Sequence, residues 1–354
     1  MADEADQVRQ DDEVLTERRG DIGHLILNRP RAINALNQAM VQRLTDTLTR
    51  WADDDDVRAV VLSGAGDRGL CAGGDIVAIY HSLRDGHDAA ARFWAEEYAL
   101  DAAIAAYPKP YIALMDGLVL GGGIGLSAHG RIRVVTERTR VGMPEVSIGF
   151  FPDVAGSWLL ARAPGELGTH LALTGGTASG SDAIALGLAD HYVPSVRIPA
   201  MLEALEIARL DPAEPGGVVD IVAGFAIEPS PSKLLTQRDW IDAAYAGDDA
   251  QTIVGRLSAS PEPRAREAAA TILSKSPTSV AVTLAALRRA PSLADVRAAL
   301  NQDLQIATRF TRGTEVLEGI RAQVIDKDRT PHWNPATLAE VSPETVAQYF
   351  EEHV

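Results

Sequence analysis

Short apolar segments with the pattern of buried β-strands alternate with helical segments through the first half of the chain. Two strands, 14–19 and 22–28, are joined at Gly20-Asp21, which is a hairpin signal. Asn37 suits the cap of a helix whose apolar residues recur on one face through residue 51. Further strands are predicted at 58–63, 111–115, 131–136 and 139–142, and further helices at 89–106 and 121–128. Strands that alternate with helices predict an α/β fold.

The pattern changes after about residue 194. Amphipathic helical segments such as 279–289 and 293–310 follow, separated by loops rich in proline and serine. We therefore expect a core at 14–195 and a helical C-terminal region at 196–354 that packs on the core and completes the site. The acidic and polar segment 1–13 is predicted to be disordered.

Composition and charge indicate a globular protein that does not bind nucleic acid. With 354 residues, of which 46% are hydrophobic and 23% charged, the chain has ample material for a buried core. Its formal net charge of -16 argues against nucleic-acid binding, which needs a basic surface. An acidic chain that binds an anionic ligand must do so through local arginines and amide dipoles.

The cysteine and histidine pattern predicts neither a disulfide nor a metal site. Cys71 is the single cysteine, and the eight histidines are scattered without metal-ligand spacing. No run of about 18 apolar residues that could span a membrane is present. The N-terminus has neither signal nor transit character. We expect a cytoplasmic protein with no membrane or nucleic-acid partner and no cofactor.

A glycine-rich turn, Leu70-Cys71-Ala72-Gly73-Gly74-Asp75-Ile76, connects a predicted buried strand to a helix. Small residues let the backbone approach a ligand closely, and the N–H groups of a turn that enters a helix point outward as donors. The same pattern is typical of a tight strand-to-helix turn without a ligand, so both interpretations stay open. Cys71 is expected to be a small buried neighbour of this turn and not a nucleophile.

A triple glycine, Gly121-Gly122-Gly123, begins a segment of small residues that runs to Ala128. Gly123 and Gly125 resemble part of a dinucleotide fingerprint, but no compact strand–turn–helix unit with an acidic residue about 20 positions on is evident. We therefore exclude that interpretation. The segment instead suits the start of a helix whose free amides face a carbonyl oxygen.

Two carboxylates stand close together in the segment Met143-Pro144-Glu145-Val146-Ser147-Ile148-Gly149-Phe150-Phe151-Pro152-Asp153. Pro144 suits the first position of a helix, which places Glu145 in the first turn, where the helix dipole favours an ionised carboxylate. Framed by apolar residues, Glu145 and Asp153 could form an acid/base or nucleophile pair. Two exposed helix caps are the alternative.

In this order the three segments resemble the enoyl-CoA hydratase/isomerase, or crotonase, superfamily. Other matching segments are Leu27-Asn28-Arg29-Pro30, Asn34-Ala35-Leu36, Arg58-Ala59-Val60-Val61-Leu62 and Gly187-Leu188-Ala189-Asp190. The resemblance implies repeated ββα units that form a spiral around two nearly perpendicular sheets. It also implies an acyl-CoA substrate and assembly as a homo-oligomer, either a trimer or a hexamer.

The resemblance also implies roles for individual residues. The N–H groups of Ala72 and Gly122 would form an oxyanion hole for the thioester carbonyl. Donors preorganised in this way stabilise the charge that develops on the oxygen, and each is typically worth about 3 kcal/mol. Candidates for contact with coenzyme A are Arg29, Arg31, Ala32, Asn34, Ala35, Ala72, Gly73, Gly74 and Asp75. The alternative for the two arginines is that they are surface charges only.

The chain departs from the pattern of the hydratases at two positions, and there it resembles the 3-hydroxyisobutyryl-CoA hydrolase subfamily. Hydratases use two glutamates, and Gly125 occupies the first of these positions, so only Glu145 matches. Asp153 stands where hydratases carry a glycine. Further matches to the subfamily lie at Glu96-Glu97-Tyr98 and at 326–335. The substrate-binding residues that the resemblance implies are Glu97, Gly122, Glu145 and Asp153.

The implied reaction is hydrolysis of 3-hydroxyisobutyryl-CoA to the free hydroxy acid and coenzyme A, a step of valine degradation. Glu145 would attack the thioester carbonyl to give a mixed anhydride or would activate water directly. Asp153 would hydrogen-bond the substrate hydroxyl or assist proton transfer, whereas Glu97 has the alternative of being an exposed helical acid. Two other functions stay open: an enoyl-CoA hydratase or isomerase that uses Glu145 alone, and a non-catalytic acyl-CoA binding subunit.

Overall fold

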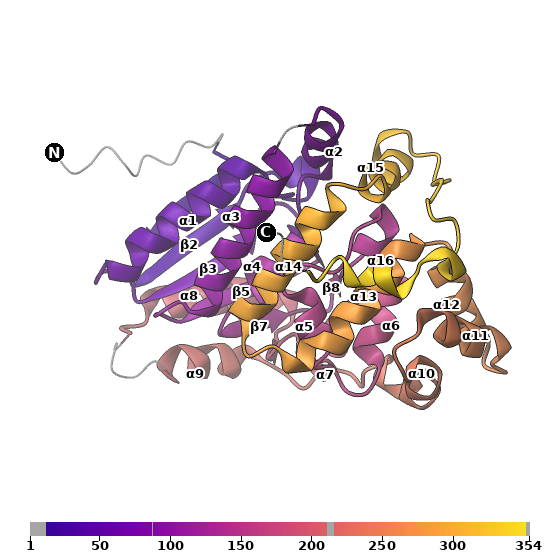
Figure 1. Cartoon of the computed structure of the whole chain (residues 1–354). Coiled ribbons are helices and arrows are strands. Elements are labelled where there is room, and N and C mark those ends of the chain that lie inside the picture. The colour runs from indigo at the N-terminus through magenta and orange to yellow at the C-terminus, as the bar shows by residue number, and fades with distance from the viewer. Residues whose placement is uncertain (1–11, 87, 211–215, 352–354) are drawn as a thin grey trace. The chain divides into compact units, whose positions relative to one another are not determined.

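The computed structural model describes residues 12–86, 88–210 and 216–351 (Figure 1). The segment 1–13, predicted to be disordered, therefore lies outside the described residues except for its last two positions. The strands are β1 (Val14–Arg19), β2 (Ile22–Leu27), β3 (Ala59–Gly64), β4 (Gly69–Cys71), β5 (Tyr111–Met115), β6 (Leu118–Leu120), β7 (Ile132–Val135), β8 (Arg140–Gly142), β9 (Thr177–Ser179) and β10 (His191–Tyr192). The α-helices are α1 (Gln38–Asp53), α2 (Ile76–Arg84), α3 (Ala89–Ala105), α4 (Gly122–Ala128), α5 (Gly156–Leu160), α6 (Leu167–Thr174), α7 (Gly180–Ala185), α8 (Ile198–Ile207), α9 (Gly216–Phe225), α10 (Arg238–Tyr245), α11 (Ala250–Ala259), α12 (Pro263–Leu273), α13 (Pro277–Arg289), α14 (Val296–Phe310), α15 (Glu315–Ile320) and α16 (Pro343–Ala347).

The predicted α/β fold with a helical C-terminal region is confirmed. The largest shift of an expected boundary is at α14, which begins at Val296 and not at residue 293. The reason is local, because the Asp295 carboxylate accepts the Ala298 N–H at 2.9 Å and thereby caps the helix. Within the part of the chain that the structure describes, no helix is both long and apolar enough to cross a membrane.

The chain folds into two compact units, each made of three segments. Unit 1 comprises Met1–Gly74, Ala99–Val141 and Ser179–Pro231, and unit 2 comprises Asp75–Tyr98, Gly142–Ala178 and Ser232–Val354. The two units cut across the boundary that we predict between residues 195 and 196. Segment 142–178 of the predicted core belongs to unit 2, and segment 196–231 of the predicted C-terminal region belongs to unit 1.

A six-stranded sheet forms the centre of unit 1, in the order β1-β2-β3-β5-β7-β10. β1 and β2 form the predicted antiparallel hairpin, with Val14 opposite Leu27. The strands β3, β5, β7 and β10 follow in parallel, and parallel neighbours require long crossover connections. A second sheet has the order β4-β6-β8-β9, so both sheets that the resemblance implies are present.

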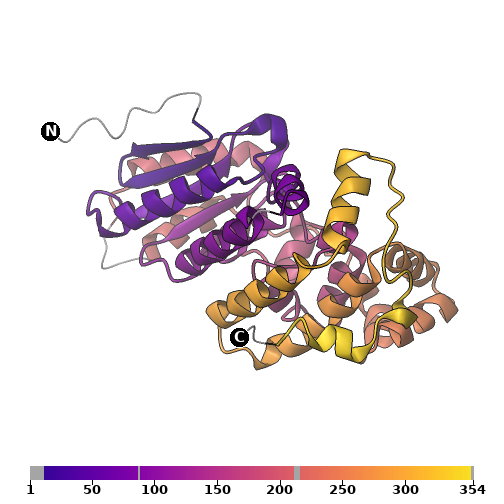
Figure 2. The ribbon, with the colours of Figure 1, turned by 45° about the horizontal axis from the view of Figure 1, so that its top comes forward.

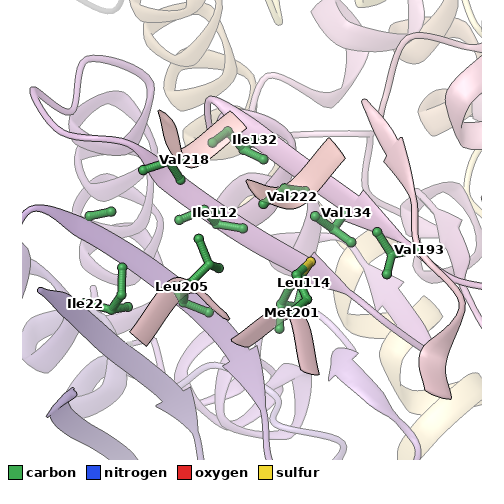
Figure 3. Close-up of a cluster of buried hydrophobic side chains, with 12 residues drawn as sticks. Ile22, Ile112, Leu114, Ile132, Val134, Val193, Met201, Leu205, Val218 and Val222 are labelled. Carbon is green, nitrogen blue, oxygen red and sulfur yellow. The ribbon is translucent and has the colours of Figure 1, made fainter. Parts of the chain in front are cut away.

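Different helices cover the two faces of the six-stranded sheet. Ile22 of β2 packs toward α8 and α9 (Figure 3), whereas a Cβ atom at the next residue, Gly23, would lie 2.7 Å from the Trp51 ring of α1. Successive side chains of a strand point to opposite faces, so the sheet is buried on both. Figure 2 shows the pink segments of α8 and α9 on the far side of the strands from α1. The cluster on the α8 and α9 side is formed by Ile22, Ala59, Val61, Ile112, Leu114, Ile132, Val134, Val193, Met201, Leu205, Val218 and Val222.

Asn34 connects the loop before α1 to β4 and to the loop that precedes β4. Its side chain accepts the Arg29 N–H at 2.9 Å. The same side chain donates to the carbonyl oxygens of Ala65, Gly69 and Leu70, each at 3.1 Å. Asn34 is 0% exposed and has a left-handed φ of 55°, which asparagine tolerates better than most residues. Its side chain is therefore a structural link between the loop before α1 and the segment that runs from the β3–β4 loop into β4.

Unit 2 is mainly helical, and an aromatic cluster occupies part of its interior. Trp94 stacks on Phe150 with ring centroids 4.8 Å apart, and Phe151 stacks on Phe310 of α14 at 5.8 Å. Phe310 also lies 4.6 Å from the Tyr349 ring. Such pairs contribute beyond the burial of their area, and here they anchor segment 150–151 to α14.

Replacing Asn34 by alanine should lower the free energy of unfolding by about 3 kcal/mol, because several buried backbone groups lose their hydrogen-bond partner. Chemical denaturation followed by circular dichroism measures this change. Asn37→Ala is the matched control, since Asn37 caps α1 by accepting the Met40 N–H at 2.9 Å. Loss of a cap costs about 1 kcal/mol. A loss for Asn34→Ala no larger than for the control would contradict the structural role of Asn34.

Candidate active site

Unit 2 buries the three carboxyl side chains that the sequence singled out for substrate chemistry. Glu97 is 2% exposed, Glu145 is 8% exposed and Asp153 is 5% exposed. Glu97 lies in the part of α3 that belongs to unit 2, and the other two lie on either side of Gly149. Exposed caps or an exposed helical acid are therefore excluded as descriptions of these residues.

Glu145 begins a short 3-10 helix, Glu145–Ile148, and Pro144 occupies the N-cap position. The prediction that Glu145 lies in the first turn of a helix is confirmed, whereas Pro144 precedes the helix and is not its first residue. The helix is short because Gly149 follows in a left-handed conformation, and its N–H donates to the Glu145 carbonyl oxygen. This single turn fixes the backbone from which the Glu145 side chain projects.

Asp153 is held from two directions. The Tyr98 hydroxyl donates to its Oδ2 atom at 2.7 Å. The two residues that follow, Val154 and Ala155, have left-handed φ values of 50° and 57°. The Ala155 N–H donates to Oδ2 of Asp303, on α14, at 2.7 Å. Sequence reasoning named Tyr98 only as part of a matching segment and missed Asp303, which lies 150 residues away in an amphipathic helix without a local signal.

Burial and like charges shift the pKa values of these carboxyl groups upward. Burial, followed by the charge of Asp153, raises the pKa of Glu145 and of Glu97 well above the ordinary range. Burial raises the pKa of Asp153 to about 7, although the hydrogen bond from Tyr98 opposes this shift. The charge of Asp153 acts on both glutamates, so the three carboxyl groups lie close to one another. Among them Asp153, with its pKa of about 7, suits acid/base chemistry near neutral pH.

One oxygen of Glu145 and one of Glu97 lack a protein partner. Within the described residues, Oε2 of Glu145 and Oε1 of Glu97 are buried and accept no hydrogen bond. A buried polar atom without a partner is unfavourable unless another molecule supplies the hydrogen bond. Both atoms are therefore available to a substrate or a water molecule.

The glycine-rich turn and the start of α4 come together in unit 1, but one predicted amide is already engaged. The Ala72 N–H donates to the Ile33 carbonyl oxygen at 2.9 Å, which contradicts the oxyanion role predicted for Ala72. Two residues on, the Gly74 N–H has no acceptor within the described residues, and neither has the Gly122 N–H. The glycine-rich turn lies beside the start of α4 at Gly73, which has a φ of 100°. A Cβ atom at Gly73 would lie 3.7 Å from the Gly122 nitrogen. Gly74 thus replaces Ala72 as the candidate partner of Gly122.

The residues predicted to contact coenzyme A differ in their exposure and in the hydrogen bonds that they already make. Arg31 and Ala32 are exposed, whereas the buried Asn34 side chain is fully engaged, which contradicts a ligand contact by that side chain. Arg29 pairs with Glu13 at 3.0 Å and donates to the Ala35 carbonyl oxygen at 2.5 Å. The coenzyme contacts of Arg29, Arg31, Ala32 and Ala35 stay a prediction.

Asp75, also predicted to contact coenzyme A, has a structural task at the start of α2. Its carboxylate accepts the Ala78 N–H at 3.3 Å and so caps the helix. Cys71 is buried as predicted, and the Gly73 N–H points to its sulfur at 3.4 Å. Coenzyme contact by Asp75 stays a prediction alongside this capping role.

Gly125 has no room for a side chain. A Cβ atom at Gly125 would lie 2.5 to 2.8 Å from the carboxyl atoms of Asp101, a residue that is 0% exposed. Contacts this short require something to move, and a short buried side chain has little freedom to do so. A carboxylate therefore cannot be supplied from position 125 unless Asp101 is displaced.

Comparison with known proteins identifies the family. The model of the enoyl-CoA hydratase/isomerase family matches residues 22–350. A mitochondrial 3-hydroxyisobutyryl-CoA hydrolase of Xenopus tropicalis is 36% identical over 346 residues, which cover 96% of this chain and 89% of the relative. The mouse protein of the same name is 38% identical over 342 residues, with the same coverage. These similarities confirm the resemblance predicted from the sequence.

Two solved structures resemble the whole chain. A carnitinyl-CoA dehydratase from Mycobacterium thermoresistibile is 48% identical, with a TM-score of 0.91 and coverage of 97% of both chains. An enoyl-CoA hydratase from Rhodobacter sphaeroides is 39% identical, with a TM-score of 0.88 and coverage of 96% of this chain and 97% of that one. The fold, the matched family model and the full-length relatives agree, and the chain belongs to the enoyl-CoA hydratase/isomerase family.

Proposed function

We propose that the chain hydrolyses 3-hydroxyisobutyryl-CoA, or a closely related 3-hydroxyacyl-CoA thioester, to the free hydroxy acid and coenzyme A. The observation that carries this proposal is similarity over 96% of the chain to relatives named as 3-hydroxyisobutyryl-CoA hydrolases. The buried carboxyl groups of Glu145 and Asp153 support it, because thioester hydrolysis needs a nucleophile or base.

The amides of Gly74 and Gly122 are proposed to polarise the thioester carbonyl. Negative charge develops on that oxygen when a nucleophile adds to the carbonyl carbon. Each preorganised N–H donor lowers the barrier by about 3 kcal/mol. Backbone donors suit this task because they need no rearrangement during the reaction.

Glu145 is proposed to act on the carbonyl carbon by one of two routes. In the first, its carboxylate adds to that carbon, the C–S bond breaks to release the coenzyme A thiolate, and water hydrolyses the resulting mixed anhydride. In the second, Glu145 accepts a proton from a water molecule that adds directly to the carbonyl carbon, and the C–S bond then breaks to release the coenzyme A thiolate. The free Oε2 atom of Glu145 is compatible with either route.

Asp153 is proposed to bind the substrate hydroxyl or to return a proton to the leaving thiolate. Its Oδ2 atom already accepts the Tyr98 hydroxyl at 2.7 Å, so Oδ1 is the atom assigned to this role. Burial raises the pKa of Asp153 to about 7, and an acid with a pKa near the working pH transfers protons most effectively. Glu97 is proposed to bind substrate through its free Oε1 atom.

Hydration or isomerisation with Glu145 alone is the second candidate function. It is favoured by the names of the two solved relatives, a dehydratase and a hydratase. The lack of space at Gly125 weighs against it, because the second carboxylate used by hydratases cannot occupy that position beside Asp101. A role in valine degradation and a homo-oligomeric state also belong to the proposal and rest on the resemblance alone. A cytoplasmic location is proposed from the single cysteine, Cys71, which suits a reducing compartment.

A thiol-release assay across a panel of acyl-CoA thioesters tests the reaction class and the substrate together. We expect release of coenzyme A from 3-hydroxyisobutyryl-CoA at a higher kcat/KM than from acetyl-CoA or crotonyl-CoA. Loss of enoyl absorbance from crotonyl-CoA without release of thiol would favour the second candidate and overturn hydrolysis.

Glu145→Gln should lower kcat for thiol release by at least about 100-fold, because the amide is neither a nucleophile nor a base. The dissociation constant for the acyl-CoA, measured by calorimetry, should change little, since the side chain keeps its shape. Glu344→Gln, at an exposed position of the same unit, is the control and should keep the wild-type rate. A wild-type rate in Glu145→Gln would remove Glu145 from the mechanism.

Asp153→Asn should stabilise the protein at alkaline pH. The pKa of Asp153 is raised from 3.8 to about 7, so the folded state binds more protons than the unfolded state between these values. Stability is therefore lost as pH rises through about 7. The variant avoids this loss and should gain about 2 to 4 kcal/mol at about pH 8, and much less at about pH 4, in urea denaturation. The exposed Asp248→Asn is the control, and an equal gain at both pH values would contradict the raised pKa.

Gly125→Glu should fail to introduce hydratase activity and should lower the free energy of unfolding by at least about 2 kcal/mol, because the new side chain collides with Asp101. Gly255→Glu is the matched control, since a Cβ atom at that exposed glycine of α11 meets nothing within 4 Å. Denaturation measures stability, and the absorbance of crotonyl-CoA measures hydration. Efficient hydration by Gly125→Glu alone would contradict the exclusion of a side chain from this position.

A further inference from the structure

Asp303 is a buried acid on α14 that the proposed reaction does not use. Its side chain is 1% exposed. Its Oδ2 atom accepts the Ala155 N–H at 2.7 Å. Burial raises its pKa well above the ordinary range; the hydrogen bond from Ala155 opposes this shift and the charge of Asp153 adds to it. Burial of a carboxyl group is unfavourable unless a hydrogen-bond partner compensates for the lost hydration.

That partner is the turn that follows Asp153. Val154 and Ala155 both have left-handed backbones, with φ values of 50° and 57°. Such conformations cost about 1 to 3 kcal/mol each and are rare for a β-branched residue, so they persist only where the surroundings enforce them. Both residues are 0% exposed, and the Gly156 N–H closes the turn by donating to the Asp153 carbonyl oxygen at 2.5 Å.

α14 is itself docked on the segment that leads into this turn. Phe310 lies seven residues after Asp303, and this spacing places both side chains on one face of the helix. The Phe310 ring stacks on Phe151 with an interplanar angle of 8°. The helix therefore contacts the chain on both sides of Asp153, through an aromatic ring before it and a carboxyl group after it.

We propose that Asp303 is a positioning residue for Asp153, which by accepting the Ala155 N–H holds the left-handed Val154–Ala155 turn and aims the Asp153 carboxyl group at the substrate hydroxyl. This inference rests on the proposed function, and on the first of the two roles proposed there for Asp153, which is to bind the hydroxyl of a 3-hydroxyacyl group. It assigns the specificity for a hydroxylated acyl chain to a residue of α14 that lies 150 positions away in the sequence.

The test compares a substrate that carries the hydroxyl with one that lacks it, 3-hydroxyisobutyryl-CoA and isobutyryl-CoA. Asp303→Ala should lower kcat/KM for the first by about tenfold and leave kcat/KM for the second within about twofold, because only the hydroxylated substrate needs Asp153 in place. Asp303→Asn keeps an acceptor oxygen for Ala155 and should restore most of the preference. Asn301→Ala, on the exposed side of α14, is the control.

A double-mutant cycle tests whether Asp303 acts through Asp153. In an Asp153→Asn background, Asp303→Ala should change kcat/KM by less than about twofold, because the group that it positions is already altered. Equal losses for both substrates would overturn the proposal and leave Asp303 with a purely structural role. Additive losses in the double variant would overturn it as well.

A binding measurement separates this inference from the hydrolysis proposal. In the Glu145→Gln protein, in which turnover is slowed, calorimetry gives the affinity for both acyl-CoA thioesters. Adding Asp303→Ala should weaken binding of 3-hydroxyisobutyryl-CoA by about tenfold and leave that of isobutyryl-CoA unchanged. Absence of thiol release by the wild type would sink the hydrolysis proposal alone, whereas unchanged binding selectivity would sink the role of Asp303 alone.

Discussion

Burial of several acidic side chains within one compact unit is the constraint on which the candidate site depends. Each carboxyl group that leaves water loses hydration, and each neighbour of like charge adds to that loss. Unit 2 nevertheless holds Glu97, Glu145, Asp153 and Asp303 at exposures of 8% or less. The result is a set of groups with raised pKa values, which is the property that acid/base chemistry near neutral pH requires.

The surrounding structure compensates for this cost in ways that also fix the geometry. The Tyr98 hydroxyl and the Ala155 amide each donate to one carboxyl oxygen. Aromatic stacking between Phe151 and Phe310 packs the same segment and keeps it from relaxing into solvent. Stability given up by burying acids is thus partly recovered through hydrogen bonds and ring contacts that hold Asp153 in one orientation.

The candidate groups of unit 1 are backbone amides and not carboxyl groups. An amide is free for a ligand only where the local fold leaves it without an acceptor. The tight turn at Gly73 leaves the Gly74 N–H without an acceptor among the described residues. The Ala72 N–H, two positions earlier, donates to the Ile33 carbonyl oxygen. Gly125 shows the same dependence on close packing, since Asp101 occupies the volume that a side chain there would need.

The sequence by itself determined the α/β fold and the family. It predicted strands at the places of β1, β2, β3, β5, β7 and β8 but not β4, β6, β9 and β10, and it singled out Glu145 and Asp153 as candidates. These follow from local patterns: apolar periodicity, capping residues such as Asn37, and motifs within a few consecutive positions. Only the tertiary structure decided that Ala72 is not a free donor, that Asn34 is a structural link and that Asp303 holds the turn after Asp153. Each of these depends on a hydrogen bond between residues far apart in the chain, and a periodic pattern carries no information about which distant group will accept a given N–H.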